Sequence, residues 1–598
     1  MLKKFFFQVL TSFMGAWLAI VLAGVVAVVL VVALVGSMFS GNAEGVRKNS
    51  VLKITLEGVL EEREAGHNIN IQLGDLLNGG REKVQTVETL VAAIEEAKSN
   101  SDIRCIYLDC KGIGGAPASL HAVREALQDF KQCKKKIFAY ADNMTGGDYF
   151  LASVADEIAL NPAGQVQMHG LGGISLFYKD LFDKIGVEFQ AVRVGKGKSA
   201  IEPYTSSTMS DVAREQNLTL YTTLWNGMTA DMQKSRPALQ AGRLDTLISV
   251  DLISCRPAKF VLDNKVVTSL EYRHAFEDKI GRYSGHEHGM ENVVSPQLLA
   301  QKQAAADYNF SADNQVAVVY ACGGIDTSVA GSGINSAELT EQIYELVEDK
   351  DVKALVLRVN SPGGSAFGSE QIWEALEKFK ATGRPFVVSM GDYAASGGYY
   401  ISSGADRIFA DPLTITGSIG IYGLIPNIHG LCEKVGLNPQ MVATNPQALF
   451  PNFFYSMDER QLAAMQSMVE DGYNLFVKRC SDGRKIPVAK LHEIADGRPV
   501  AGTTALKLGL VDELGSLEGA VKYAATRAKL KKWNVVKYPG GKNPLQELLK
   551  TLDEQQNAFA LMSVTDPQRV LEAVRPLLME FAGNGALQAS MPRIIFSY

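Results

Sequence analysis

The sequence predicts an α/β protein made of two tandem repeats that follow an N-terminal transmembrane helix. Three observations support this class: short apolar segments alternate with amphipathic ones, the alternation occurs twice, and residues 5–43 contain no charged side chain. Short apolar strands alternating with amphipathic helices are typical of parallel βαβ units with buried strands. A chain of 598 residues is also too long for one hydrophobic core.

The charge-free N-terminal stretch predicts an uncleaved membrane anchor. Residues 17–35 are a Leu/Val/Ala/Ile run that, at about 1.5 Å per residue, can cross a hydrocarbon core of about 30 Å. A buried core helix or a cleaved signal peptide is the alternative, but the apolar part of a signal peptide usually spans only about 7–15 residues. Lys3 and Lys4 precede the run, whereas charges of both signs follow it. This asymmetry predicts that most of the chain lies outside the cytoplasm.

Both repeats are expected to contain the same order of elements. In the first repeat, strands are expected over residues 51–56, 105–108 and 136–140, and helices over 88–98 and 121–131. In the second, strands are expected over 315–321, 354–359 and 385–389, the last running into a glycine-rich turn, and helices over 336–349 and 369–380. Later segments predict helices near 211–235 and 457–480 and a closing strand and turn over 497–515. The predicted domains are 1–45 (tail and anchor), 46–312 (first repeat), 313–540 (second repeat) and 541–598 (helical tail).

The two repeats align without a gap over residues 141–170 and 391–420, at an offset of 250. Nine positions are identical, and Gly147 and Gly397 are one of these pairs. Immediately before that pair, the second repeat has Ser396 where the first has Gly146. A packing role would require the same residue in both repeats, so this difference indicates chemistry in the second repeat only. Ser396 is therefore the candidate nucleophile.

Glycines near Ser396 are candidate donors for an oxyanion hole. Ser396 is expected at the start of a helix after a buried strand, where backbone N–H groups and the helix dipole favour a developing anion. Gly363, in the turn at residues 361–365, and Gly397 allow the main chain to approach a substrate carbonyl closely. The alternative for these glycines is a plain tight turn. The first repeat has glycines in residues 111–115 but lacks the Ser-Pro-Gly-Gly-Ser sequence.

The candidate general base is Lys198. It lies in the first repeat and aligns with Ala448 of the second at the offset of 250. The first repeat therefore has the lysine without the serine, and the second has the serine without the lysine. A lysine is more often a solvated surface group, as Lys196 is expected to be. His169 and His429 lie in or just after the aligned blocks and are alternative bases. His286 and His288 lie in a polar loop where a metal site is improbable, and the cysteine spacing predicts no metal site either.

Four sequence motifs together resemble the signal peptide peptidases of the long, two-repeat bacterial type, also called protease IV. These are residues 361–365 (SPGGS), 394–399 (ASGGY with a preceding Ala), 416–420 (TGSIG) and 198–203 (KSAIEP). The resemblance implies a membrane-bound Ser–Lys peptidase with the crotonase/Clp-protease fold. It implies Ser396 as nucleophile, Lys198 as base and Ser418 as the hydroxyl that orients the lysine amine. The first repeat has Met168 in the place of Ser418.

The function expected from these features is cleavage of peptides, with released signal peptides as the substrates that the resemblance implies. No metal, nucleotide or other cofactor is expected. Peptides and membrane lipid are the expected partners, together with further copies of the chain, as a tetramer by resemblance. A net charge of −6 argues against a nucleic-acid partner. The resemblance and the anchor predict a single-pass protein of the bacterial inner membrane with its site on the periplasmic side.

Two other functions are compatible with the same fold. A crotonase-type acyl-CoA enzyme would use a similar oxyanion hole, but such enzymes usually employ carboxylates, and an outward-facing site would be separated from cytoplasmic CoA. A non-catalytic membrane scaffold could use the duplicated domains only for binding. Labelling of Ser396 by a serine-directed fluorophosphonate would exclude the scaffold.

Overall fold

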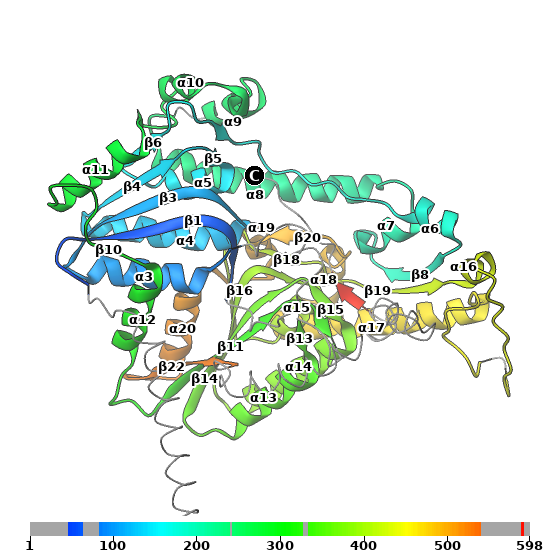
Figure 1. Cartoon of the computed structure of the whole chain (residues 1–598). Coiled ribbons are helices and arrows are strands. Elements are labelled where there is room, and N and C mark those ends of the chain that lie inside the picture. Colours follow the sequence, from blue (N-terminus) through cyan, green and yellow to red (C-terminus); the bar gives the residue numbers. More distant parts are fainter. Residues whose placement is uncertain are drawn as a thin grey trace, which may run out of the picture.

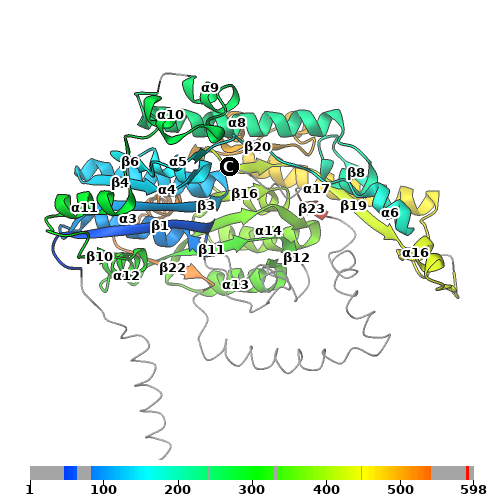
Figure 2. The ribbon, with the colours of Figure 1, turned by 45° about the horizontal axis from the view of Figure 1, so that its top comes forward.

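The computed structural model describes residues 46–63, 83–239, 242–326, 333–445, 447–539 and 588–590 (Figures 1 and 2). The predicted anchor and nearly all of the predicted helical tail lie outside these residues. Within them, no helix combines the length and the apolar character needed to span a membrane. The described chain is a mixed α/β structure with parallel sheets, as the alternating pattern predicts.

The first sheet is built entirely from residues of the first repeat. Along its main path the strand order is β10-β1-β3-β4-β6-β9, with β2 paired to β1, and all pairings are parallel. The strands are β1 (Ser50–Glu61), β2 (Val84–Thr86), β3 (Ile103–Gly115), β4 (Lys136–Ala141), β6 (Glu157–Leu160), β9 (Ser269–Leu270) and β10 (Val293–Val294). A separate short pair joins β5 (Met144–Thr145) to β7 (Val166–Gln167).

The second sheet repeats this arrangement with residues of the second repeat. Its main order is β20-β18-β16-β14-β11-β22, with β17 and β21 attached beside β16, and only β20 runs antiparallel to its neighbour. The strands are β11 (Gln315–Cys322), β14 (Val352–Ser361), β16 (Phe386–Ala395), β17 (Arg407–Ala410), β18 (Ile415–Gly417), β20 (Pro499–Ala501), β21 (Glu513–Leu514) and β22 (Asn534–Tyr538).

A third sheet joins the two repeats. Its order is β13-β12-β15-β23-β19-β8, and β8 is its only strand from the first repeat among the described residues. The strands are β8 (Glu188–Val194), β12 (Ile325–Asp326), β13 (Ile334–Asn335), β15 (Gly363–Ser365), β19 (Ile421–Asn427) and β23 (Gln588–Ser590). β8 and β19 form an extended arm that carries α6 and α16 away from the two main sheets (Figure 1).

Helices cover both main sheets (Figure 2). Those of the first repeat are α3 (Val87–Ser99), α4 (Pro117–Phe130), α5 (Gly146–Ala152), α6 (Lys179–Ile185), α7 (Glu202–Thr205), α8 (Asp211–Ser235), α9 (Arg243–Ser249), α10 (Ala258–Asp263), α11 (Arg273–Ser284) and α12 (Pro296–Asp307). Those of the second are α13 (Ser336–Glu348), α14 (Ala366–Ala381), α15 (Gly397–Ser402), α16 (His429–Lys434), α17 (Glu459–Arg484), α18 (Val488–Ile494), α19 (Gly502–Leu508) and α20 (Leu517–Arg527). Within the described residues, three short 3-10 helices lie at Lys131–Cys133, Ser199–Ile201 and Ile253–Cys255.

The two repeats share a packed and hydrogen-bonded junction. Ala395 and Ile415, from the second repeat, belong to the same buried apolar cluster as the core of the first. At the N-terminus of α4, both the backbone N–H and the hydroxyl of Ser119 donate to the carboxylate of Asp392, each at 2.7 Å. These contacts fix the end of β16, and therefore the residue that follows it, relative to the first repeat.

The structure differs from the sequence-based elements in several places. Strand β3 continues through the glycine-containing residues 111–115, and the expected turn at residues 361–365 contains the short strand β15. The strand expected to end at residue 389 continues to Ala395, because its second half pairs with β14 and β18 after a bulge. The segment 497–515 contains a helix, α19, between two short strands. Within the tail expected to be helical, Gln588–Ser590 is a strand that pairs with β15 and β19.

Candidate active site

Ser396 lies at a sharp turn between β16 and α15. Its φ of 56° and ψ of −113° are unusual for a residue with a side chain, and such strained turns are common at functional sites. The backbone N–H of Ser396 donates to the carbonyl of Gly417 on β18 at 2.8 Å, which holds the turn in place. The side chain is fully buried.

Lys198 reaches Ser396 from the first repeat. β8 pairs antiparallel with β19 so that Val194 lies opposite Ile421, and this register brings the turn after β8 to the residues just before β19. The amine Nζ of Lys198 lies 2.6 Å from Oγ of Ser396. It also lies 3.0 Å from the carbonyl oxygen of Ser418 and 3.2 Å from its Oγ. The structure therefore brings together three of the residues that the sequence singled out.

Burial controls the protonation state of this lysine. The Lys198 side chain is 1% exposed, and removal from water lowers its pKa to about 7. A buried ammonium loses hydration that its hydroxyl and carbonyl neighbours replace only in part, so the neutral amine is favoured. Near neutral pH, a large fraction of Lys198 is consequently an amine that can accept the hydroxyl proton of Ser396.

Ser418 is held between the lysine and a neighbouring loop. Its hydroxyl donates to the carbonyl of Gly497 at 3.0 Å, which leaves an oxygen lone pair directed to the lysine amine. The backbone of Ser418 has a φ of 51°, a second strained position beside Ser396. The contact with Gly497 was not foreseen from the sequence, because nothing in residues 497–515 indicates proximity to residue 418.

Gly363 and Gly397 lie on β15 and α15, two elements that contact each other. Gly363 opens β15 with a φ of 107°, a conformation that strains any residue with a side chain. Its N–H donates to Oγ of Ser361 at 3.2 Å. Gly397 is the first residue of α15, so its N–H has no acceptor within that helix.

The corresponding turn of the first repeat is closed by a carboxylate. The N–H groups of Gly112 and Ile113 donate to the two oxygens of Asp148, at 3.0 and 3.1 Å, and Asp148 is fully buried. The second repeat has Gly398 at the aligned position, so no side chain fills the turn there. The first repeat thus lacks the serine and also has its backbone donors occupied. The capping pattern Thr145-x-x-Asp148 was the available sequence signal for this arrangement.

The two histidines considered as alternative bases have other partners. Nδ1 of His169 lies 3.3 Å from Oγ of Ser254, and Nε2 of His429 lies 3.4 Å from the carboxylate of Glu433. The hydroxyl of Ser396, in contrast, contacts the amine of Lys198.

A strand from the C-terminal region lies beside the candidate site. β23 pairs antiparallel with β15, where Gly363 is opposite Ser590, and with β19, where Tyr422 is opposite Gln588 (Figure 1). The edges of β15 and β19 are therefore spaced to hold one extended peptide between them. This arrangement was not predicted, because three residues of a helical pattern carry no signal for distant pairing.

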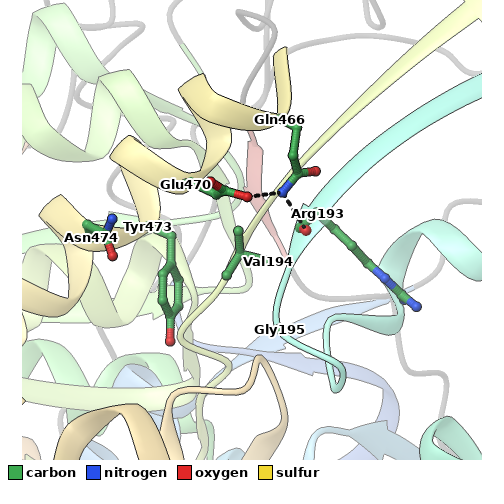
Figure 3. Close-up of a pocket in the computed structure, with 7 residues that line it drawn as sticks. All are labelled: Arg193, Val194, Gly195, Gln466, Glu470, Tyr473 and Asn474. Atoms are coloured by element: carbon green, nitrogen blue, oxygen red, sulfur yellow. Dashed lines mark hydrogen bonds between the residues drawn. The ribbon is translucent and has the colours of Figure 1, made fainter. Parts of the chain in front are cut away.

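A polar pocket of about 470 Å³ opens next to the end of β8 (Figure 3). The amide of Gln466, on α17, bridges the carbonyl of Arg193 and the carboxylate of Glu470 across it, at 3.3 and 2.9 Å. The pocket lies within a few residues of Lys198 along the chain but does not include Lys198 or Ser396 in its lining.

Comparison with known proteins identifies the family. The family model described as peptidase family S49 matches residues 129–244 and 378–531. A protease 4 of Salmonella typhi is 34% identical over 83% of this chain and 81% of its own length. The chain belongs to peptidase family S49. It is thus a serine peptidase related to protease 4, as the sequence motifs indicate.

Two further relatives cover most of the chain. A protease 4 of Haemophilus influenzae is 32% identical over 87% of this chain and 86% of its own length. A chloroplastic serine protease SPPA of Arabidopsis thaliana is 27% identical over 94% of this chain and 80% of its own length. The two ranges matched by the S49 model include Lys198, Ser396 and Ser418, whereas Gly363 lies between them.

Proposed function

We propose that this S49 peptidase cleaves peptides with Ser396 as nucleophile and Lys198 as general base. The observation that carries the proposal is the 2.6 Å contact between Nζ of Lys198 and Oγ of Ser396 in a buried setting that lowers the lysine pKa to about 7. A serine nucleophile needs a base within hydrogen-bonding distance. Membership in a peptidase family favours this function over an acyl-CoA enzyme or a scaffold.

The reaction begins with proton transfer from Ser396 to the neutral amine of Lys198. Oγ of Ser396 forms a bond to the scissile carbonyl carbon, and the carbonyl π electrons move to its oxygen. The N–H groups of Gly363 and Gly397 stabilise this oxyanion, and for Gly363 the substrate replaces Oγ of Ser361 as acceptor. The lysine ammonium then protonates the leaving nitrogen as the C–N bond breaks.

The second half of the reaction removes the acyl group. Lys198 is neutral again after protonating the leaving amine, so it can take a proton from water. The resulting hydroxide attacks the ester carbonyl, and the ammonium returns the proton to Oγ of Ser396 as the acid product leaves. Ser418, fixed by the carbonyl of Gly497, orients the amine for both steps.

The substrate is an extended peptide that adds a strand between β15 and β19. β23 occupies this place with antiparallel backbone pairing to both strands, and such strand addition is a common mode of peptide recognition. Signal peptides released into the membrane are the substrate class that the family resemblance supports. They would reach the site from the bilayer if the predicted N-terminal anchor holds the protein there.

Labelling with a fluorophosphonate tests the nucleophile directly. The purified full-length protein should label at Ser396, and Ser396→Ala should abolish both labelling and peptide cleavage. Lys196→Ala provides a control, because Lys196 is exposed and two residues from the proposed base. Unchanged cleavage by folded Ser396→Ala would exclude Ser396 as the nucleophile.

Protease accessibility tests the proposed membrane orientation. Protease added outside spheroplasts should digest the protein, whereas protease confined to the cytoplasmic side should leave it intact. Digestion only from the cytoplasmic side would reverse the proposed topology.

A further inference from the structure

Two aromatic side chains project from the segment that connects α12 to β11. Tyr308 and Phe310 are 55% and 94% exposed, and their ring centroids lie 4.9 Å apart in an edge-to-face arrangement. An aromatic ring gains much free energy when it leaves water, and neighbouring apolar groups left exposed on a folded protein mark a contact surface. The pair of rings therefore indicates a surface that meets an apolar environment outside the described chain.

The turn that carries these rings is held in one shape by a buried side chain. The amide of Asn534, on β22, donates to the carbonyl oxygens of Asn309 and Ala312, each at 3.0 Å. It also accepts from the N–H of Asn309 at 2.7 Å, and Asn534 is only 6% exposed. The side chain of Asn309 accepts in turn from the N–H of Ser311 at 3.0 Å. A turn fixed in this way loses little conformational entropy when its rings bind.

The segment before Asn534 places positive charges beside the rings. Nζ of Lys532 donates to Oγ of Ser311 at 3.1 Å, which holds this segment against the aromatic turn. Residues 527–532 carry four positive charges and residues 307–313 two negative ones, a local excess of +2 in a chain whose net charge is −6. Together with the two rings, four exposed cations form an aromatic–basic patch: Arg527, Lys529, Lys531 and Lys532.

The cations of the patch are not neutralised by neighbouring acids. Lys522, earlier on α20, pairs with Glu518, and Lys537, on β22, pairs with Glu88. Among the described residues, none of the four patch cations has such a carboxylate partner. Their charge is therefore available to anionic groups outside the chain.

The patch lies on the side of the molecule where residues 1–45 join the described chain. The side-chain amide of Asn292, next to β10, donates to the carbonyl oxygen of Lys48 at 3.2 Å. α12 begins two residues after β10, and its 12 residues span about 18 Å, so the rings lie roughly one helix length from Asn292. Figures 1 and 2 show β10, α12 and β22 along one side of the molecule. The predicted anchor, residues 17–35, brings this side near a bilayer.

We propose that the aromatic–basic patch is a docking surface for a bilayer that contains anionic phospholipid. Aromatic rings are favoured at the headgroup level of a membrane, and each basic side chain near an anionic surface strengthens binding about fivefold. The negative net charge of the chain argues against a nucleic acid as the anionic partner. Docking adds a second membrane contact to the predicted anchor, and two contacts fix the orientation of the folded part on the bilayer.

Hydroxyl-radical footprinting of the full-length protein in lipid nanodiscs tests this docking. Discs of phosphatidylcholine alone are compared with discs that contain about 30% phosphatidylglycerol, in which oxidation of Phe310 should be at least about fivefold slower. Tyr272 is the internal reference, because it is 57% exposed and lies outside the patch, so it should be oxidised equally in both discs. Equal oxidation of Phe310 in both discs would overturn the proposal, and equally slow oxidation would indicate a protein contact instead.

Charge reversal within the patch provides a matched test. Lys531→Glu combined with Lys532→Glu should abolish the difference in Phe310 oxidation between the two discs. Lys485→Glu combined with Lys490→Glu is the control, because both lysines are exposed outside the patch and the change in net charge is the same. This control should retain the parental difference. Undiminished protection of Phe310 in the patch variant would refute the role of anionic lipid.

The predicted anchor and the patch can fail separately in this assay. Copurification with the neutral discs reports on the anchor, whereas the difference in Phe310 oxidation reports on the patch. Copurification with the anionic discs alone would support the patch without the anchor, and copurification with neither would exclude both. Peptidase activity is not required, so the outcome remains informative if the proposed nucleophile or base is wrong.

Discussion

At the scale of single residues, the proposed chemistry depends on one contact between two repeats. Ser396 and Lys198 act as a unit in the proposed reaction, because the amine of Lys198 is the base that lies within hydrogen-bonding distance of the Ser396 hydroxyl. Lys198→Ala should therefore lose as much kcat/KM as Ser396→Ala, and the double variant should lose no more. Lys196→Ala should stay within about twofold of the parent. A Lys198→Ala variant that still gives a full acyl-enzyme burst would contradict the assignment of the base.

The pH dependence of activity follows from the burial of Lys198. Its pKa of about 7 means that the protonated, inactive form dominates in acid and the neutral form above neutrality. We expect kcat/KM to rise about tenfold per pH unit below pH 7 and to level off above about pH 8. Initial rates on a peptide substrate between pH 5 and 10 measure this. A midpoint near 10 would show that the amine remains hydrated in the working enzyme.

The same pKa removes one way of distinguishing lysine from histidine. From the sequence alone, a profile that is flat above about pH 7 would favour His169 or His429 as base. Because the pKa of Lys198 is about 7, the pH profile expected for a lysine base coincides with that expected for a histidine base. Only substitution of each residue can therefore identify the base. His169→Ala and His429→Ala should keep activity within about tenfold of the parent.

The candidate reacting residues can be predicted from the sequence, but their surroundings cannot. Ser396 and Lys198 stand out because the first repeat has Gly146 and the second has Ala448 at the aligned positions. The 2.6 Å distance, the lowered pKa and the contact of Ser418 with Gly497 depend on how β8 and β19 pair across the repeats. Such long-range pairing leaves no pattern in either segment by itself.

At the scale of elements, strand pairing overrides local preference at two places. Residues 391–395 look like a glycine-rich turn, yet they extend β16, because β18 on one side and Ser361 on the other provide backbone partners. Residues 497–515 contain a helix that the expected strand and turn do not include. In contrast, the ends of the amphipathic helices α3, α13 and α14 lie within a few residues of their expected ends. Their apolar residues recur with helical periodicity because one face of each helix is buried, so the sequence indicates these helices directly.

The placement of β23 predicts that the C-terminal region competes with peptide substrates. In a strand with neighbours on both edges, successive N–H groups alternate between them, so a proline at any position removes one ladder bond. Ala589→Pro should therefore lower KM and leave kcat unchanged. If β23 occupies its place nine-tenths of the time, KM should fall about tenfold.

Ala589→Ser is the matched control, because it retains the N–H, and its KM should equal that of the parent. Hydrogen exchange at Gly363–Ser365 provides a second measurement, with faster exchange expected in Ala589→Pro only. Unchanged KM and unchanged exchange in the proline variant would show that β23 does not block these edges in solution.

At the scale of the whole molecule, duplication followed by divergence accounts for the single candidate site in the part of the chain that the structure describes. The two main sheets share the same order of parallel strands, whereas the site combines the turn after β8 with the turn after β16. In the first repeat the equivalent turn is filled by the carboxylate of Asp148. The doubled α/β fold could be predicted from internal similarity. The closure of the first turn could be predicted only in part, because the pattern Thr145-x-x-Asp148 indicates a helix start but not that the same carboxylate accepts from Gly112 and Ile113.

The position of Lys198 relative to Ser396 depends on the junction between the repeats, which includes a buried ion pair. Nδ1 of His121, on α4, lies 2.6 Å from the carboxylate of Asp411 in the second repeat, and Nε2 lies 3.3 Å from Asp231 on α8. Burial by itself would lower the pKa of His121, but Asp411 and Asp231 outweigh it and raise the pKa to about 10. The imidazolium therefore stabilises the folded junction.

This ion pair makes the stability of the junction depend on pH. A histidine whose pKa is raised on folding contributes fully below its unfolded value, about 6.5, and the contribution disappears as the pH rises through about 10. His121→Gln should therefore lower Tm strongly at pH 6 to 7, by several degrees, and the difference from the parent should shrink towards pH 10. His288→Gln, at an exposed histidine, should leave Tm unchanged at every pH. A His121→Gln deficit that is constant from pH 6 to 10.5 would mean that packing rather than charge at His121 holds the two repeats together.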